Sequence, residues 1–150
     1  VIIGGGDIFM KRLLPIFKAS FFVPLFGDGS TKFQPVFIDD VSLAINQIIN
    51  TSITGKSIYE LAGPRIYSYK EFFNHISNFL NKTRVLVPVP MGVMKPMINI
   101  AEKTPISPLT SEQLMLFEKD NLAVNVDKSF ENLDINPQDT LQILKNIVVN

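Results

Sequence analysis

The feature that most constrains this fold is a β-branched run, residues 1–3, that leads directly into three glycines and then Asp7. A short valine and isoleucine run bounded by glycines is typical of a buried strand, and an aspartate after the turn can cap a helix. A strand that passes at once into a helix is the repeating unit of α/β folds. Because one such strand cannot form a sheet alone, we expect residues 1–3 to be the last strand of a larger sheet and to lie at an unpaired edge.

Composition narrows the classes of protein and the kinds of site. Of the 150 residues, 46% are hydrophobic and 19% charged, which is typical of a globular domain rather than a disordered segment. Fourteen basic and fourteen acidic residues give a net charge of zero, so no overall positive field favours nucleic acid as a partner. Cysteine is absent and histidine occurs once, which excludes thiolate and multi-histidine metal sites. No run approaches the roughly 18 consecutive apolar residues of a membrane span.

Helical spacing predicts two helices in the first fifty residues. The first covers residues 8–17, and Pro15 is expected to kink or divide it. The second places apolar side chains at helical spacing over residues 41–49. Asp39 or Asp40 precedes that helix, so we expect one of them to cap it.

A glycine turn separates two β-rich segments between these helices. Residues 21–26 and 32–38 are rich in aromatic and β-branched side chains and flank Gly-Asp-Gly-Ser at residues 27–30. Glycine adopts positive φ without steric cost, which suits a tight turn between strands. The pattern predicts a β-hairpin.

The second half of the chain alternates short strands and helices. The predicted elements are a strand over residues 57–61, a helix from a Ser68–Glu71 capping box to about Leu80, a strand over residues 85–89, helices over residues 94–101 and 110–117, a short helix near Phe130 and a last helix from Pro137. Gly55 is expected to end the connection before them, and residues 105–108 to join the two middle helices.

Several motifs together resemble one family. They are residues 1–7, 32–41 (KFQPVFIDDV), 59–64 (YELAGP), 67–71 (YSYKE) and 107–110 (SPLT), followed by Gln113, Asp120 and Asn121. Over about residues 1 to 125, this combination resembles an atypical subgroup of the short-chain dehydrogenase/reductase superfamily. That subgroup contains the NAD(P)H-binding accessory subunit of respiratory complex I and its bacterial relatives, often described as NAD-dependent epimerase/dehydratase-like.

The resemblance implies an α/β chain that forms the C-terminal part of a Rossmann-fold extended short-chain dehydrogenase/reductase. We expect the last sheet strand followed by a small mixed α/β domain on the substrate side. Residues 1–50 would end the Rossmann domain with a hairpin insertion, residues 51–125 would form the small domain, and residues 126–150 a helical tail. The expected partner of this fragment is the N-terminal Rossmann half.

The same resemblance implies NAD or NADP as the cofactor of the intact protein. Members of the family hold the pyrophosphate with a glycine-rich turn after the first strand. Residues 4–6 lack the GxGxxG spacing, so we interpret them as a strand-to-helix turn and expect no cofactor to bind the fragment alone. The alternative rests on position: ligands gather at the carboxyl ends of strands, where Ile3 and Gly4 would border the nicotinamide pocket.

No catalytic residue is predicted in this chain. The superfamily's enzymes use a Tyr-x-x-x-Lys pair, in which lysine lowers the tyrosine pKa so that tyrosine can transfer a proton. That spacing does not occur here: Tyr67, Tyr69 and Lys70 lie at the start of a predicted helix, where ring packing is the simpler interpretation. His75 has no serine or cysteine motif to activate.

Phe33 and Gln34 are the candidates on the substrate side. Sugar-nucleotide epimerases, which the hairpin region resembles more distantly, present an arginine to the substrate diphosphate where this chain has Phe33. A phenyl ring cannot replace a bidentate guanidinium, so the residues favour an apolar pocket or a packed surface. An ordinary strand role for Gln34 is the alternative. Asp40 resembles the family's aspartate at this helix start, where capping is its expected role.

Three functions remain open from the sequence. The first is nucleotide binding without strong catalysis, in or beside the respiratory NADH:quinone machinery. The second is an NAD(P)-dependent epimerase, dehydratase or reductase acting on a small molecule. The third is a protein-interaction module whose apolar helices over residues 91–117 dock on a protein or membrane surface. The first hypothesis implies a cytoplasmic or mitochondrial matrix location, with complex I subunits or the inner-membrane surface as partners.

Overall fold

Short strands alternate with helices in the computed structural model, which describes residues 1–51, 56–101, 110–124 and 128–149. The strands are β1 (Ile2–Ile3), β2 (Phe22–Phe26), β3 (Lys32–Phe33), β4 (Val36–Phe37), β5 (Tyr67–Ser68) and β6 (Val85–Val89). The helices are α1 (Ile8–Ala19), α2 (Ile38–Asn50), α3 (Tyr69–Phe79), α4 (Met91–Ala101), α5 (Ser111–Leu114) and α6 (Thr140–Val149), with 3-10 turns at Met115–Phe117 and Glu131–Leu133. The predicted α/β class is confirmed.

The strands pair in three two-stranded sheets within the described part of the chain. β1 pairs in parallel with β4, β2 in parallel with β6, and β3 antiparallel with β5. β1 has a strand partner on one side among the described residues, in agreement with the expected open edge. Ile3 is fully buried while Ile2 is half-exposed, so one face of this edge strand enters the core.

The predicted hairpin over residues 21–38 is wrong, although its turn forms. Gly27 and Gly29 have positive φ and Asp28 accepts hydrogen bonds from Ser30, but β2 and β3 join different sheets. The start of α3 separates them. β3 pairs with β5 just before α3, and the N–H groups of Tyr69 and Lys70 donate to the carbonyls of Thr31 and Gly29.

Capping residues in the sequence correctly predicted where several helices begin. Asp7 accepts hydrogen bonds from the N–H groups of Phe9 and Met10 at the start of α1, and Ser68 with Glu71 forms a complete capping box on α3. Thr110 and Gln113 exchange the corresponding bonds before α5. α1 is one continuous helix that includes Pro15, so the proline does not divide it.

The prediction that Asp39 or Asp40 caps α2 is wrong. The helix begins at Ile38, its N-cap is Phe37 with no side-chain cap, and both aspartates lie within the first turn. Asp40 is buried and accepts hydrogen bonds from the backbone N–H and the side-chain amide of Gln138, at 2.9 and 3.1 Å. Its carboxylate therefore fastens the segment before α6 to α2.

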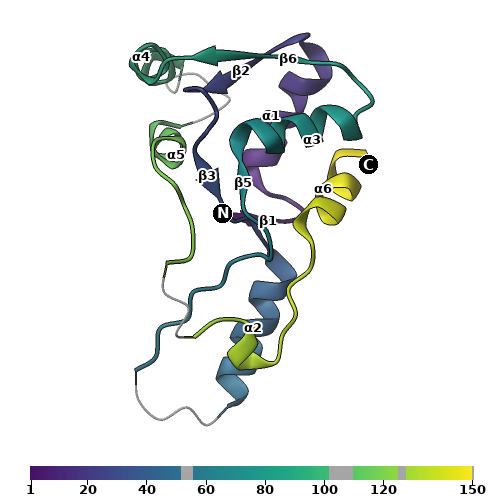
Figure 1. Ribbon diagram of the computed structural model, residues 1–150, viewed down its shortest axis with the longest axis vertical. Coiled ribbons are helices and arrows are strands. Elements are labelled where there is room, and N and C mark those ends of the chain that lie inside the picture. The colour runs from purple at the N-terminus through teal and green to yellow at the C-terminus, as the bar shows by residue number, and fades with distance from the viewer. Residues whose placement is uncertain (52–55, 102–109, 125–127, 150) are drawn as a thin grey trace.

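Two hydrophobic clusters hold the elements together. The larger unites α1, β2, α3, α4 and α6 around buried aromatic rings, and Leu144 and Val148 bring α6 into it. The smaller joins α2 to the 3-10 turn near Phe130. Figure 1 shows the result as an elongated molecule with β2, β6 and α4 at one end and α2 extending toward the other. The expected division at residues 51 and 126 stays a prediction.

Other boundaries differ from the predictions. Residues 57–61 form no strand; the N–H of Glu60 instead donates to the carbonyl of Lys128. The last helix begins at Thr140, not at Pro137. Gly55, the connection over residues 105–108 and the first three residues of the 107–110 motif lie outside the described residues.

Candidate functional site

The turn after β1 lies where an α/β fold places its ligands, but the two predicted residues are buried. Ile3 has no exposed surface, and a Cβ on Gly4 would lie 2.3 Å from Cγ2 of Ile38. Glycine is therefore required at position 4 by the packing of α2 against this turn. Gly5 and Gly6 form the exposed rim, and a cofactor role for Ile3 and Gly4 stays a prediction.

Phe33 and Gln34 lie in different surroundings, since Phe33 ends β3 and Gln34 stands in the connection to β4. Phe33 is fully buried: its ring stacks on Tyr69 with centroids 4.3 Å apart and meets the edge of Phe72 at 5.1 Å. In this structure Phe33 is a core residue with no surface open to a ligand. A substrate contact through Phe33 stays a prediction.

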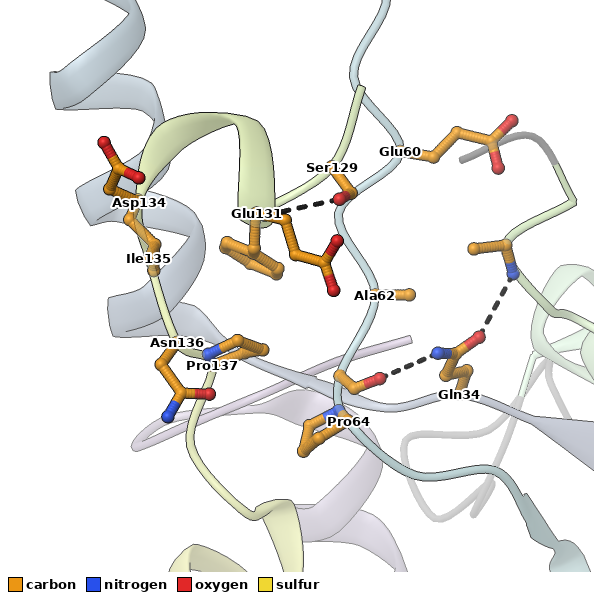
Figure 2. A pocket seen from close by; sticks show the side chains of 13 residues that line it. Gln34, Glu60, Ala62, Pro64, Ser129, Glu131, Asp134, Ile135, Asn136 and Pro137 are labelled. Carbon is orange, nitrogen blue, oxygen red and sulfur yellow. Dashed lines mark hydrogen bonds between the residues drawn. The ribbon is translucent and has the colours of Figure 1, made fainter. Parts of the chain in front are cut away.

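Gln34 lines a pocket of about 610 Å³. Figure 2 shows its side chain held at both ends of the amide. The amide nitrogen donates to the carbonyl of Gly63 at 2.7 Å, and the amide oxygen accepts from the N–H of Ala123 at 3.3 Å. Gln34 thus joins two connecting segments at the wall of the pocket, and a substrate contact through it stays a prediction.

The pocket is acidic. Its described lining includes Glu60, Glu131 and Asp134 and contains no lysine, arginine or histidine. A phosphate or diphosphate needs cationic or clustered N–H donors, so the pocket suits a neutral or cationic polar molecule instead. Much of the lining comes from residues 129–137, which no sequence motif marked.

Three segments cross at the edge of this pocket. A Cβ on Gly63 would lie 1.8 Å from the carbonyl oxygen of Pro35 and 3.3 Å from Oγ1 of Thr140. Buried Thr140 donates from that hydroxyl to the same carbonyl, at 2.9 Å. The Gly63 crossing, defined by Pro35, Gly63 and Thr140, therefore fixes the connection before β4, the pocket wall and the start of α6 relative to one another.

Tyr67 and Tyr69 lie in surroundings that disfavour loss of the hydroxyl proton. Burial raises the pKa of Tyr69 far above its ordinary value, and its hydroxyl donates to the carbonyl of Leu116 at 3.4 Å. Burial likewise raises the pKa of Tyr67, whose hydroxyl is buried without a hydrogen-bond partner among the described residues. A catalytic tyrosine needs its pKa lowered, and both shifts have the opposite sign. The ring of His75 packs on Phe79 and against Tyr67.

The described residues contain neither a metal site nor a membrane-spanning helix. No group of three or more histidine, aspartate or glutamate side chains there could hold a metal ion. Within the same ranges, every helix is too short or too polar to cross a membrane.

Solved structures define the class of fold. The chain is similar to dTDP-4-dehydrorhamnose reductase from Bacillus anthracis, in complex with NADP, with a TM-score of 0.60 and 16% identity over 97% of this chain and 44% of that one. It is also similar to triphenylmethane reductase from Citrobacter sp., with a TM-score of 0.68 and 14% identity over 95% of this chain and 48% of that one. The fold is that of Rossmann-type reductases of the extended short-chain dehydrogenase/reductase kind.

No protein-family model matches the chain. Related sequences show which group of this fold class it belongs to. The chain is 30% identical over 147 residues to NADH dehydrogenase [ubiquinone] 1 alpha subcomplex subunit 9 of Arabidopsis thaliana, covering 90% of this chain and 36% of that protein. It is 28% identical over 109 residues to the NADH-ubiquinone oxidoreductase 40 kDa subunit of Neurospora crassa, covering 72% and 29%. The chain belongs to the atypical short-chain dehydrogenase/reductase group that contains these complex I subunits, and it spans about a third of their length.

Proposed function

We propose that the protein containing this chain binds NAD or NADP without strong catalysis and acts as an accessory or assembly subunit of an NADH:quinone oxidoreductase. The observation that carries the proposal is the 30% identity to a complex I subunit over 90% of the chain. The fold supports the nucleotide part, since a neighbour of the same fold is a complex with NADP.

The residues described here fit a supporting role toward the nucleotide. The turn over residues 4–6 lacks the spacing of a phosphate cradle, and Gly4 is packed against α2. The open edge of β1 gives the remaining Rossmann strands a place to pair, and it would bring the exposed rim at Gly5 and Gly6 beside their carboxyl ends. In this arrangement the N-terminal half is the structural partner and supplies the pyrophosphate contacts.

Within this chain, Tyr67 and Tyr69 offer no catalytic group. Neither Tyr67 nor Tyr69 has a lysine at the required spacing, and burial raises the pKa of both. An enzyme of the same fold is the second candidate, favoured by the acidic pocket beside Gln34, which could receive a small polar substrate. A Tyr-x-x-x-Lys pair elsewhere in the full-length protein would favour that candidate.

Native purification tests the assembly proposal. The full-length protein, tagged at its C-terminus, should co-migrate with NADH dehydrogenase activity on a native gel, at the cytoplasmic or matrix face of the membrane. Migration solely as a free protein, together with NADPH-dependent turnover of a carbonyl substrate, would overturn the accessory role and favour the enzyme.

A further inference from the structure

Charge is unevenly distributed in this chain, although its net charge is zero. Residues 8–27 and 72–101 together contain six lysine and arginine residues and no aspartate or glutamate. All fourteen acidic residues lie in the other segments. The two acid-free segments contain α1, β2, β6, α4 and most of α3. β2, β6 and α4 meet at one end of the elongated molecule (Figure 1). On α4, Lys95 is paired with Glu118, so the excess positive charge of that end comes from Lys18, Lys82 and Arg84.

The same end exposes an apolar sheet face. In the parallel register of β2 and β6, Phe22 lies beside Val85 and Pro24 beside Val87. Phe22 is 61% exposed, and Val85 and Val87 are each 40% exposed. Parallel strands in proteins are normally covered on both faces, so a bare apolar face of this kind indicates a missing partner.

The apolar face continues onto α4. Pro24 and Met97 line one pocket of about 190 Å³, whose ten lining side chains are all apolar. Met97 is 58% exposed, and Ile100, one turn further along the helix, is 73% exposed. We call the surface formed by Phe21, Phe22, Val85, Val87, Met97 and Ile100 the apolar end.

Basic side chains border the apolar end where α1 finishes. Lys82 donates from Nζ to the carbonyl of Lys18 at 3.1 Å, and Arg84 donates from Nε to the carbonyl of Phe17 at 2.7 Å. The N–H of Val85 in turn donates to the carbonyl of Phe21, which brings the cations beside the exposed rings. Lys18 and Lys82 are exposed, so they can reach an anionic surface.

We propose that the apolar end docks on a bilayer surface that contains anionic phospholipids. Exposed aromatic and aliphatic side chains insert at the level of the headgroups, and lysines around them attract the lipid phosphates. Neither segment contains a carboxylate, and Glu118, which lies beside α4, is paired with Lys95, so repulsion from an anionic surface is small. The open edge of β1 lies away from this end, so the full-length protein could pair its remaining strands and bind lipid together (Figure 1).

Vesicle co-sedimentation of the full-length protein tests whether the basic side chains contribute to membrane binding. Binding should require phosphatidylglycerol in phosphatidylcholine vesicles and should weaken as salt is added. Each cation near an anionic surface contributes about 1 kcal/mol, so K18E/K82E should reduce partitioning about 30-fold or more. The control K56E/K145E changes the net charge equally at exposed lysines of other segments and should bind like the wild type.

A second pair of variants, F22S and I49S, tests the contribution of the exposed apolar side chains to binding. F22S removes an exposed ring at the apolar end and should reduce binding at least several-fold, whereas I49S removes a 75% exposed side chain from α2 and should not. Equal binding to vesicles without anionic lipid, unchanged binding of both K18E/K82E and F22S, or no vesicle binding at all would overturn the proposal. The last result would assign this end to a protein partner, and none of these outcomes bears on NADPH binding.

Discussion

Replacement of Gly63 by alanine is the sharpest structural test of this fold. The added Cβ would lie 1.8 Å from the carbonyl oxygen of Pro35, which is backbone and cannot rotate away. One of the two segments must therefore shift, and the shift disturbs the buried bond from Thr140 to that carbonyl. Overpacking costs about 1–3 kcal/mol and a disrupted buried hydrogen bond about 1–3 kcal/mol, so we expect G63A to lose about 2–6 kcal/mol.

Urea unfolding followed by circular dichroism measures this loss. A domain of this size is stabilised by about 5–15 kcal/mol, so a large fall in the unfolding midpoint should be obvious. The control is G92A in α4, where a Cβ meets nothing within 4 Å and alanine should be neutral or stabilising by up to about 1 kcal/mol. A G63A midpoint equal to that of the wild type would refute the Gly63 crossing.

Four further outcomes are expected. Ser68→Ala should lower stability by about 1 kcal/mol in thermal melts, because the capping box loses its acceptor for the N–H of Glu71. Hydrogen bonds from Ser68 lower the pKa of Glu71 below its ordinary 4.5. The ionised carboxylate therefore stabilises the fold fully above that pH, and this stabilisation is lost as the pH falls through the folded pKa. Glu71→Gln should flatten this part of the plot of melting temperature against pH. Phe33→Ala should cost about 3–5 kcal/mol in urea unfolding, since its ring is fully buried. The chain alone should bind a hydrophobic dye or self-associate in light scattering, and a dye-silent monomer would contradict the open edge of β1.

Helix starts could be predicted because their signals are local. The carboxylate of Asp7 accepts from the N–H of Phe9, two residues along the chain, and Ser68 and Glu71 bond each other across three residues. The spacing of these residue types was therefore enough to predict both caps. Asp40 shows the limit of this approach. It resembles a cap by position, but its partner is Gln138, 98 residues away, and no local pattern indicates that contact.

Strand pairing could not be predicted, because the paired strands are far apart along the chain. The glycine turn over residues 27–30 favours a hairpin locally, yet β2 finds a longer partner in β6, some sixty residues later. Tertiary hydrogen bonds from the start of α3 then outweigh the local preference. Hairpin signals describe a turn correctly without fixing which strands meet.

The sequence named Phe33 and Gln34 as neighbours on the substrate side, and a substrate contact through either residue stays a prediction. Gln34 lines a pocket while Phe33 enters the core, because β3 ends at Phe33 and its ring packs on Tyr69 and Phe72. The acidic lining from residues 129–137 carried no motif, because it is assembled by contacts that a single sequence does not reveal.

We propose that this chain completes a nucleotide-binding fold whose phosphate-binding turn lies in the other half of the protein. The most direct measurement is a fluorescence titration of NADPH and NADH into the full-length protein and, in parallel, into residues 1–150 alone. We expect saturable micromolar binding to the full-length protein and none to the 150 residues. Binding by the 150 residues alone, or no binding by the full-length protein, would contradict the account.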